Sequence, residues 1–220
     1  MKVKDRMTTE VRTVDLDTSV TEAFRVMKDN NVRRLPVMDK EKLVGMITLS
    51  DLNQASPSSA TTLSIHELNY ILAKTKVKDI LPKKQNLITI GPDNFIETAA
   101  KIMRQHLISG LPVMEDGKLV GIVTETDLFD ALVDILGVNT PHSRIDIYAV
   151  DRPGSLAEIT QIIARRGINI LNTVVYFDKK KCRYKIILRM EETNCDEIMA
   201  EIKSRGYEIE SVLIRQNADE

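Results

Sequence analysis

A threonine and an aspartate recur at the same spacing in two similar stretches of the chain. The stretch LVGMITLSDL at Leu43–Leu52 returns as LVGIVTETDL at Leu119–Leu128, shifted by 76 positions. The repeated pairs are Thr48 with Asp51 and Thr124 with Asp127. At the start of a helix, such groups lie among unpaired N–H groups that readily hold a phosphate, and the carboxylate can accept both hydroxyls of a ribose. The alternative is that the aspartates are only helix N-caps and the threonines only local backbone partners.

Each pair is expected where a buried strand runs into a helix. Val44–Ile47 and Val120–Val123 are apolar and β-prone, which is typical of buried strands. After Asp127, apolar residues follow at helical spacing: Leu128, Leu132, Ile135 and Leu136. This helix should end near Gly137, with Pro141 just beyond it.

The repeat also extends upstream of these junctions. KVKDRM at Lys2–Met7 is echoed by KVKDIL at Lys76–Leu81, and short extended segments are expected at Thr13-Val14 and Thr89-Ile90. An amphipathic helix should follow each segment, with apolar faces at Val20, Ala23, Phe24 and Met27, and at Ile96, Ala99, Ala100 and Met103. Asn94 with Glu97 resembles a capping box for the second of these helices.

The sequence LPVM follows each helix, at Leu35–Met38 and at Leu111–Met114. Each copy therefore reads strand, helix, strand, strand, helix. Between the copies, Ser64 and Glu67 form an S-x-x-E capping box ahead of Leu68, Ile71 and Leu72, which predicts a loop followed by a short helix.

The doubled G-h-h-T-x-x-D and LPVM motifs resemble paired CBS domains, which are regulatory modules. The resemblance covers roughly the first 136 residues and implies a domain at 1–60, a linker helix at 61–75 and a second domain at 76–138. It implies that the aspartate grips the ribose of an adenosine ligand and that the neighbouring hydroxyl faces its phosphate. The implied nucleotide-binding residues are Thr13, Val14, Arg34, Leu35, Pro36, Thr48 and Asp51 in the first copy, and Thr89, Ile90, Gly110, Leu111, Pro112, Thr124 and Asp127 in the second.

The turns before LPVM differ in charge between the copies. The first turn contains Arg33 and Arg34, whereas the second contains His106, Ser109 and Gly110. Two adjacent arginines could neutralise a polyphosphate, so two clefts that both bind should not be equivalent. A solvated basic turn explains the arginines equally well.

The C-terminal part of the chain predicts a second fold. Strands are expected at Ile145–Val150, Ile168–Phe177, Tyr184–Met190 and Glu208–Ile214, with helices lined by Leu156, Ile159, Ile162 and Ile163 and spanning Cys195–Ile202. The order βαββαβ predicts a ferredoxin-like sandwich over an antiparallel four-stranded sheet. The whole chain is thus α+β: two βαββα repeats followed by this domain.

The C-terminal domain at 143–216 resembles an ACT domain. The residues that carry the resemblance are Asp151, Pro153, Gly154 and Leu156, with Gly167-Ile168-Asn169-Ile170 after the helix. It implies an amino-acid site built from Asp151, Gly154, Ser155, Leu156, Asn169 and Ile170. The alternative is that the loop only turns the chain and that the domain dimerises through its sheet edge.

Composition excludes several classes of function. A formal charge of -1 over 220 residues argues against nucleic-acid or anionic-membrane partners, and no run of 18 apolar residues is present. The two cysteines, Cys182 and Cys195, form no C-x-x-C pair, and the three histidines show no ligand spacing, so no metal site is expected. The start MKVKDRMTTEV has no apolar core of a leader, which favours a cytoplasmic location.

These features together predict a regulatory protein without catalytic activity. The repeats offer threonine and aspartate without a histidine, a lysine dyad or a glycine-rich phosphate loop. The domain order resembles acetoin-utilisation proteins, which implies a homodimer that acts on an unknown regulated enzyme in acetoin or acetate metabolism. The expected ligand is AMP, ADP, ATP or S-adenosylmethionine, with no prosthetic group. The alternatives are an interaction scaffold with empty clefts and a nucleotide-hydrolysing enzyme.

Overall fold

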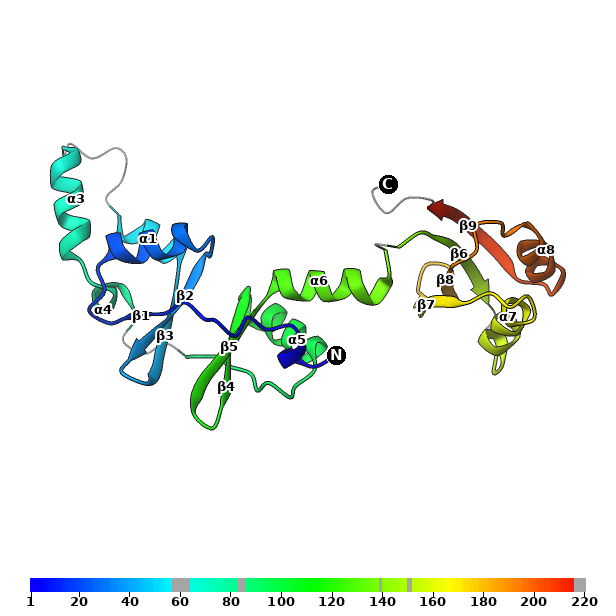
Figure 1. Ribbon diagram of the computed structural model, residues 1–220, viewed down its shortest axis with the longest axis horizontal. Helices are drawn as coiled ribbons and strands as arrows, with labels where there is room; N and C mark the ends of the chain where they lie inside the picture. The colour runs from blue at the N-terminus through cyan, green and yellow to red at the C-terminus, as the bar shows by residue number, and fades with distance from the viewer. Residues whose placement is uncertain (57–63, 83–85, 139, 150–151, 216–220) are drawn as a thin grey trace. The chain divides into compact units, whose positions relative to one another are not determined.

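The computed structural model describes residues 1–56, 64–82, 86–138, 140–149 and 152–215 (Figure 1). The chain divides into two compact units, Met1–Leu128 and Phe129–Glu220, and each is described by itself. The mixed α+β class expected from the sequence is confirmed, because both units combine helices with small sheets.

The first repeat consists of β1 (Val14–Asp15), α1 (Val20–Asp29), β2 (Arg34–Asp39), β3 (Lys42–Thr48) and α2 (Leu49–Ala55). Strand β1 lies parallel to β2, and β2 lies antiparallel to β3 with Arg34 opposite Thr48. Helix α1 begins where the hydroxyl of Ser19 accepts a 3.1 Å hydrogen bond from the backbone N–H of Glu22. Its buried residues Val20, Ala23 and Met27 lie one turn apart and face the sheet, as the pattern predicted.

The second repeat contains α5 (Ile96–His106), β4 (Gly110–Glu115), β5 (Lys118–Thr124) and α6 (Glu125–Leu136). Its first strand shrinks to a single parallel bridge between Ile90 and Val113. Two predictions for α5 were wrong. Phe95 occupies the N-cap and no side chain caps this end, because the amide of Asn94 turns back to the carbonyl of Gly91 at 3.3 Å. Ala100 is exposed, because only the narrower stripe of Ile96, Ala99 and Met103 reaches the core.

The segment before each repeat packs into the core of the other repeat. Val3 in η1 (Val3–Asp5) is fully buried in the cluster of Ile90, Ala99 and Met103. The backbone N–H of Val3 also donates to the carbonyl of Asn94 at 2.8 Å, which places the blue N-terminus beside α5 (Figure 1).

The corresponding residue of the second segment shows the same exchange. Val77 in α4 (Val77–Ile80) is fully buried in the first repeat's core, and its N–H donates to the carbonyl of Thr18 at 2.9 Å. The domain limits 1–60 and 76–138 remain predictions about the sequence repeat, whereas the packing exchanges these two segments.

The insert between the repeats contains α3 (Ile65–Lys74). Its predicted capping box is confirmed: the Ser64 hydroxyl accepts from the N–H of Glu67, and the Glu67 carboxylate accepts from the N–H of Ser64 at 2.8 Å. The serine-rich stretch 57–63 lies outside the described residues.

The C-terminal unit has the predicted order βαββαβ. It consists of β6 (His142–Ala149), α7 (Ser155–Ala164), β7 (Ile170–Asp178), β8 (Arg183–Met190), α8 (Asp196–Ser204) and β9 (Glu208–Arg215). The strands form one antiparallel sheet in the order β7-β8-β6-β9. Because side chains alternate along a strand, Ile145 and Ile147 of β6 face the two helices, and Arg144 and Asp146 occupy the opposite face.

Three single residues of this unit differ in exposure. Cys195 is buried in the core, and Cys182 is exposed in the turn between β7 and β8. Leu156 was assigned to the buried face of α7, but it is 39% exposed. The core-facing stripe of that helix begins at Ile159, because Leu156 lies one turn earlier, next to the loop.

Candidate functional site

Both threonine–aspartate pairs form closed hydrogen-bonded caps at a helix start. Oδ2 of Asp51 accepts from the N–H of Thr48 at 2.8 Å and from its hydroxyl at 2.7 Å. Oδ2 of Asp127 accepts from the same groups of Thr124 at 2.6 and 2.7 Å. The aspartates are therefore not N-caps, as the alternative supposed. Thr48 is the N-cap of α2, and Asp51 and Asp127 are the third residues of α2 and α6, where their hydrogen bonds use one carboxylate oxygen. Across the described ranges, Oδ1 of neither aspartate accepts a hydrogen bond.

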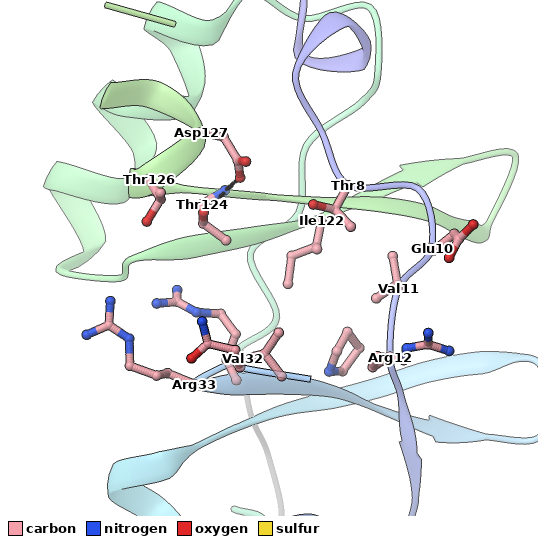
Figure 2. Close-up of a pocket in the computed structure, with 13 residues that line it drawn as sticks. Thr8, Glu10, Val11, Arg12, Val32, Arg33, Ile122, Thr124, Thr126 and Asp127 are labelled. Atoms are coloured by element: carbon pink, nitrogen blue, oxygen red, sulfur yellow. Dashed lines mark hydrogen bonds between the residues drawn. The ribbon is translucent and has the colours of Figure 1, made fainter. Parts of the chain in front are cut away.

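Asp127 lines a crevice between the two repeats, which we call the Asp127 crevice (Figure 2). Its cavity volume is about 280 Å³, close to the lower end of the range of small-molecule sites. Its lining is Thr8, Glu10, Val11, Arg12, Asn31, Val32, Arg33, Arg34, Pro36, Ile122, Thr124, Thr126 and Asp127. Figure 2 shows Arg33 on the wall formed by the first repeat, opposite the wall that carries Thr124, Thr126 and Asp127.

Asp51 lines a second crevice, the Asp51 crevice, with a cavity volume of about 220 Å³. Its lining is Arg34, Met46, Thr48, Asp51, Asn86, Leu87, Ile88, Leu107, Ile108, Ser109, Gly110 and Pro112. Each crevice thus joins the aspartate of one repeat to the turn and proline of the other. The arginines of the first repeat therefore lie opposite the aspartate of the second, a pairing between repeats that no local sequence pattern reveals.

The predicted nucleotide-binding residues separate into lining and core positions. Arg34, Pro36, Thr48, Asp51, Gly110, Pro112, Thr124 and Asp127 line the crevices. The side chains of Val14, Leu35, Ile90 and Leu111 are at most 5% exposed and belong to the two cores, and none of the four is in either crevice lining. Thr13 lines a different pocket beside Asp15 and Lys40, and Thr89 is exposed outside both crevice linings.

The sequence prediction missed residues at both ends of the Asp127 crevice. Thr8 exchanges backbone hydrogen bonds of 2.9 Å with Ile122, and this contact carries Val11 and Arg12 along the crevice wall. The exposed Thr126 also lines the crevice near the start of α6. Because the hydroxyl of Thr124 donates to Asp127, Thr126 offers the freer hydroxyl for a ligand. The only sequence signal was the stretch TTEVR before the first strand, which is weakly β-prone.

The two crevices differ in charge. Arg12, Arg33 and Arg34 line the Asp127 crevice, against the acidic Glu10 and Asp127. Among the described lining residues of the Asp51 crevice, Arg34 alone is positively charged, and the turn residues Ser109 and Gly110 are uncharged. Burial lowers the pKa of the Arg34 guanidinium, and the neighbouring charge of Arg33 lowers it further, against an opposing effect of Glu125. The guanidinium remains charged, because arginine is ordinarily protonated in proteins.

The residues predicted for an amino-acid site hold different positions in the C-terminal unit. Gly154 has a φ of 94°, a left-handed conformation that favours glycine, and Ser155 is buried with its hydroxyl donating to the carbonyl of Arg152 at 3.2 Å. The amide of Asn169 donates to Glu191, and Ile170 packs against the core. Leu156 is exposed, and Asp151 lies outside the described residues.

The described residues offer neither a metal-binding cluster nor a membrane-spanning helix. Among the residues that the structure describes, histidine, cysteine, aspartate and glutamate side chains do not gather in groups of three that could hold a metal ion. In the same residues, each helix is too short or too polar to span a bilayer.

The sequence matches the family model of the CBS domain twice, at residues 3–58 and 77–134, which together exceed half of the chain. The chain therefore belongs to the CBS-domain family and carries the domain as a tandem pair. The ACT-domain model matches residues 143–203, so the pair is followed by an ACT domain. Both assignments confirm the resemblances found in the sequence.

Individual relatives agree with this assignment. A CBS domain-containing protein of Dictyostelium discoideum is 36% identical over 143 residues, which cover 64% of this chain and 97% of that protein. An inosine-5'-monophosphate dehydrogenase of Korarchaeum cryptofilum is 37% identical over 121 residues, which cover 54% of this chain and only 22% of the enzyme.

Two solved structures share the fold of the CBS pair. The CBS domain pair of protein MJ0100, in complex with 5'-methylthioadenosine and S-adenosyl-L-methionine, has a TM-score of 0.50 and 29% identity, covering 61% of this chain and 97% of that one. A putative acetoin utilization protein from Vibrio cholerae has a TM-score of 0.51 and 24% identity, covering 63% and 94%. The second likeness concerns the fold alone, so a role in acetoin metabolism stays a prediction.

Proposed function

We propose that this chain is a non-catalytic regulatory protein whose CBS pair binds an adenosine-containing ligand, and that the Asp127 crevice favours a polyphosphate. The observation that carries the proposal is the position of Asp127, which keeps one carboxylate oxygen without a partner among the described residues, opposite Arg33 and Arg34. The complex of the MJ0100 pair with two adenosine compounds supports the ligand class.

The chemistry of the lining assigns each part of the ligand a place. Oδ1 of Asp127 accepts the ribose hydroxyls, while the hydrogen bonds of Thr124 hold the other oxygen still. The purine lies against the apolar surface of Pro36 and Ile122. The phosphates face Arg33, whose exposed guanidinium offers several donors to phosphate oxygens.

A ligand in this position contacts both repeats and can act as a link between them. If two relative orientations of the repeats bind it with different affinity, the ligand shifts their populations by that difference. The described lining contains no histidine, cysteine or lysine, which supports sensing over hydrolysis. A target enzyme, still unnamed, would respond to this shift.

Isothermal calorimetry with ATP, ADP, AMP, adenosine and S-adenosylmethionine tests the proposal. We expect ATP to bind more tightly than AMP, because its added phosphates reach Arg33. The Arg33→Ala variant should lose about tenfold in ATP affinity, the lower end of a charged hydrogen bond's worth, with AMP nearly unchanged. Arg104→Ala, an exposed arginine outside both crevice linings, is the matched control.

Two other results would contradict this proposal. Absence of heat with all five compounds would favour the scaffold with empty clefts. Steady release of phosphate from ATP that is lost in the Asp127→Asn variant would favour the nucleotide-hydrolysing enzyme.

For the ACT domain we infer a role in dimerisation through its sheet edges, with an amino acid as a further ligand. The edge strands β7 and β9 expose Val175, Phe177, Leu213 and Ile214, and uncovered edges with apolar side chains favour pairing. Light scattering should give twice the mass of one chain, and Leu213→Lys should reduce it to the mass of one chain.

An amino acid that binds should raise the melting temperature by mass action. A monomeric wild type would contradict the dimer, and no shift with any of the twenty would contradict the amino-acid role.

A further inference from the structure

Arg34 lines both crevices, although one crevice contains Asp127 and the other contains Asp51. The linings correspond position by position at a shift of 76: Ile122 matches Met46, Pro112 matches Pro36, and Gly110 matches Arg34. Arg34 therefore contacts its own counterpart. A residue can do so only near the axis that relates the two repeats.

Gly110 leaves the space that the Arg34 side chain fills. A Cβ atom at Gly110 would lie 3.0 Å from Cδ of Arg34 and closer still to its Nη1. The guanidinium extends past this glycine and donates from Nη2 to the hydroxyl of Ser109. A second arginine at position 110 would occupy the same volume, so only one guanidinium fits at this point between the two crevices.

The charge of Arg34 is available to a ligand. Within the ranges that the structure describes, Arg34 forms no ion pair with a carboxylate, and its hydrogen bond to Ser109 goes to a neutral hydroxyl. A partly buried cation gains more from a phosphate than an exposed one does, because water screens it less, even though the nearby charge of Glu125 already favours the charged guanidinium. One guanidinium cannot serve phosphates in both crevices with the same donors.

We propose that Arg34 is a shared phosphate-binding residue that couples the two crevices, so that an anionic ligand in one weakens binding of an anionic ligand in the other. This inference rests on the proposed function and adds a rule for how the two sites communicate. The coupling is reciprocal, as linkage requires, and should amount to roughly tenfold, within the usual range for coupled sites. Uncharged adenosine does not need the guanidinium and escapes the coupling.

The test compares one crevice with its neighbour occupied and empty. Calorimetry with ATP on wild type gives a tight step in the Asp127 crevice and a weaker step in the Asp51 crevice. In the Asp127→Ala variant, the Asp51 crevice binds ATP while the Asp127 crevice is empty. The affinity of the Asp51 crevice for ATP in this variant should exceed that of the wild-type second step by about tenfold. With adenosine in place of ATP, the two values should agree.

The Arg34→Gln variant completes a double-mutant cycle. In the Arg34→Gln background, the ATP affinity of the Asp51 crevice should be the same with and without the Asp127→Ala substitution. Ser109→Ala, which removes only the hydrogen bond that holds the guanidinium, is the second variant if Arg34→Gln unfolds, and it should change the coupling ratio.

Each outcome decides between distinct conclusions. Equal ATP affinities in the wild-type second step and in Asp127→Ala would overturn the coupling while leaving the proposed function intact. A single ATP-binding step in wild type, together with no ATP binding to Asp127→Ala, would also overturn the coupling. A coupling that survives Arg34→Gln would assign it to another residue, and no ATP binding to wild type at all would overturn the proposed function itself.

Discussion

Replacing Asp127 by alanine should weaken ATP binding by ~10- to 150-fold, the equivalent of about 1.5–3 kcal/mol for a hydrogen bond to a charged group. The alanine removes Oδ1, the oxygen that has no partner among the described residues, and so removes the acceptor for the ribose hydroxyls. Calorimetry on the full chain measures the change as a rise in the Kd of the tight step.

Asp51→Ala is the matched control, because it occupies the same position of the other repeat and caps α2 in the same way. Both variants keep the threonine but lose the two hydrogen bonds that it donates to the aspartate, at a cost of about 1 kcal/mol in stability, so their melting temperatures should fall alike. Asp51→Ala should leave the tight step in place. A similar loss of ATP affinity in both variants would point to a shared folding defect, and an unchanged Kd in Asp127→Ala would remove the ribose assignment.

Replacing Asp146 by alanine should destabilise the ACT domain by about 3 kcal/mol, in the range found when one partner of a buried ion pair is removed. The carboxylate is 3% exposed. Arg144 donates to it at 2.6 and 2.9 Å, and the ammonium of Lys185 lies 3.0 Å away. The change leaves two cations together, although Glu210 still binds Lys185, which sets the effect at the lower end of the range.

The loss of stability caused by Asp146→Ala should depend on pH. Burial alone would raise the pKa of Asp146, but hydrogen bonds from Arg144 and Lys185 outweigh it and hold the pKa below its ordinary value. A depressed carboxylate pKa adds stability above the ordinary value of about 3.8, and this stability disappears as the pH falls through the folded-state pKa. The difference between wild type and Asp146→Ala should therefore be full at pH 7 and shrink below about pH 4.

Denaturant unfolding of the full chain, at pH 7 and below about pH 4, measures the difference in stability between wild type and Asp146→Ala. Glu208→Ala is the control, since its ion pair with Arg183 is just as short at 2.6 Å but about half exposed on both sides, and its loss should cost less than about 1 kcal/mol. If Asp146→Ala and Glu208→Ala cost the same, burial of the Asp146 pair contributes nothing measurable.

The sequence was sufficient for features that depend on neighbours along the chain. The helix stripe of α1, the Ser64 and Glu67 box and the two threonine–aspartate caps all depend on residues within a turn of each other, and all are present. The prediction for Asn94 failed within that range, because its amide found the carbonyl of Gly91 and the helix began one residue later.

Features that depend on distant segments could not be predicted in this way. The sequence showed two arginines and two aspartates, but the packing of one repeat on the other decides that Arg33 lies opposite Asp127 and that Arg34 reaches Ser109. For the same reason the motif could not show that the side chains of Leu35 and Leu111 lie in the cores of the two repeats, whereas Pro36 and Pro112 line the crevices.

The exchange of Val3 and Val77 between the repeats has a consequence for how such a chain can change. Each valine fills part of the hydrophobic core of the other repeat, so the two repeats depend on each other for complete packing. Removing one repeat, or replacing it by a homologous domain, would leave a cavity in the core of the repeat that remains. The sequence therefore repeats as a single domain, but the pair of domains is the unit that packs completely.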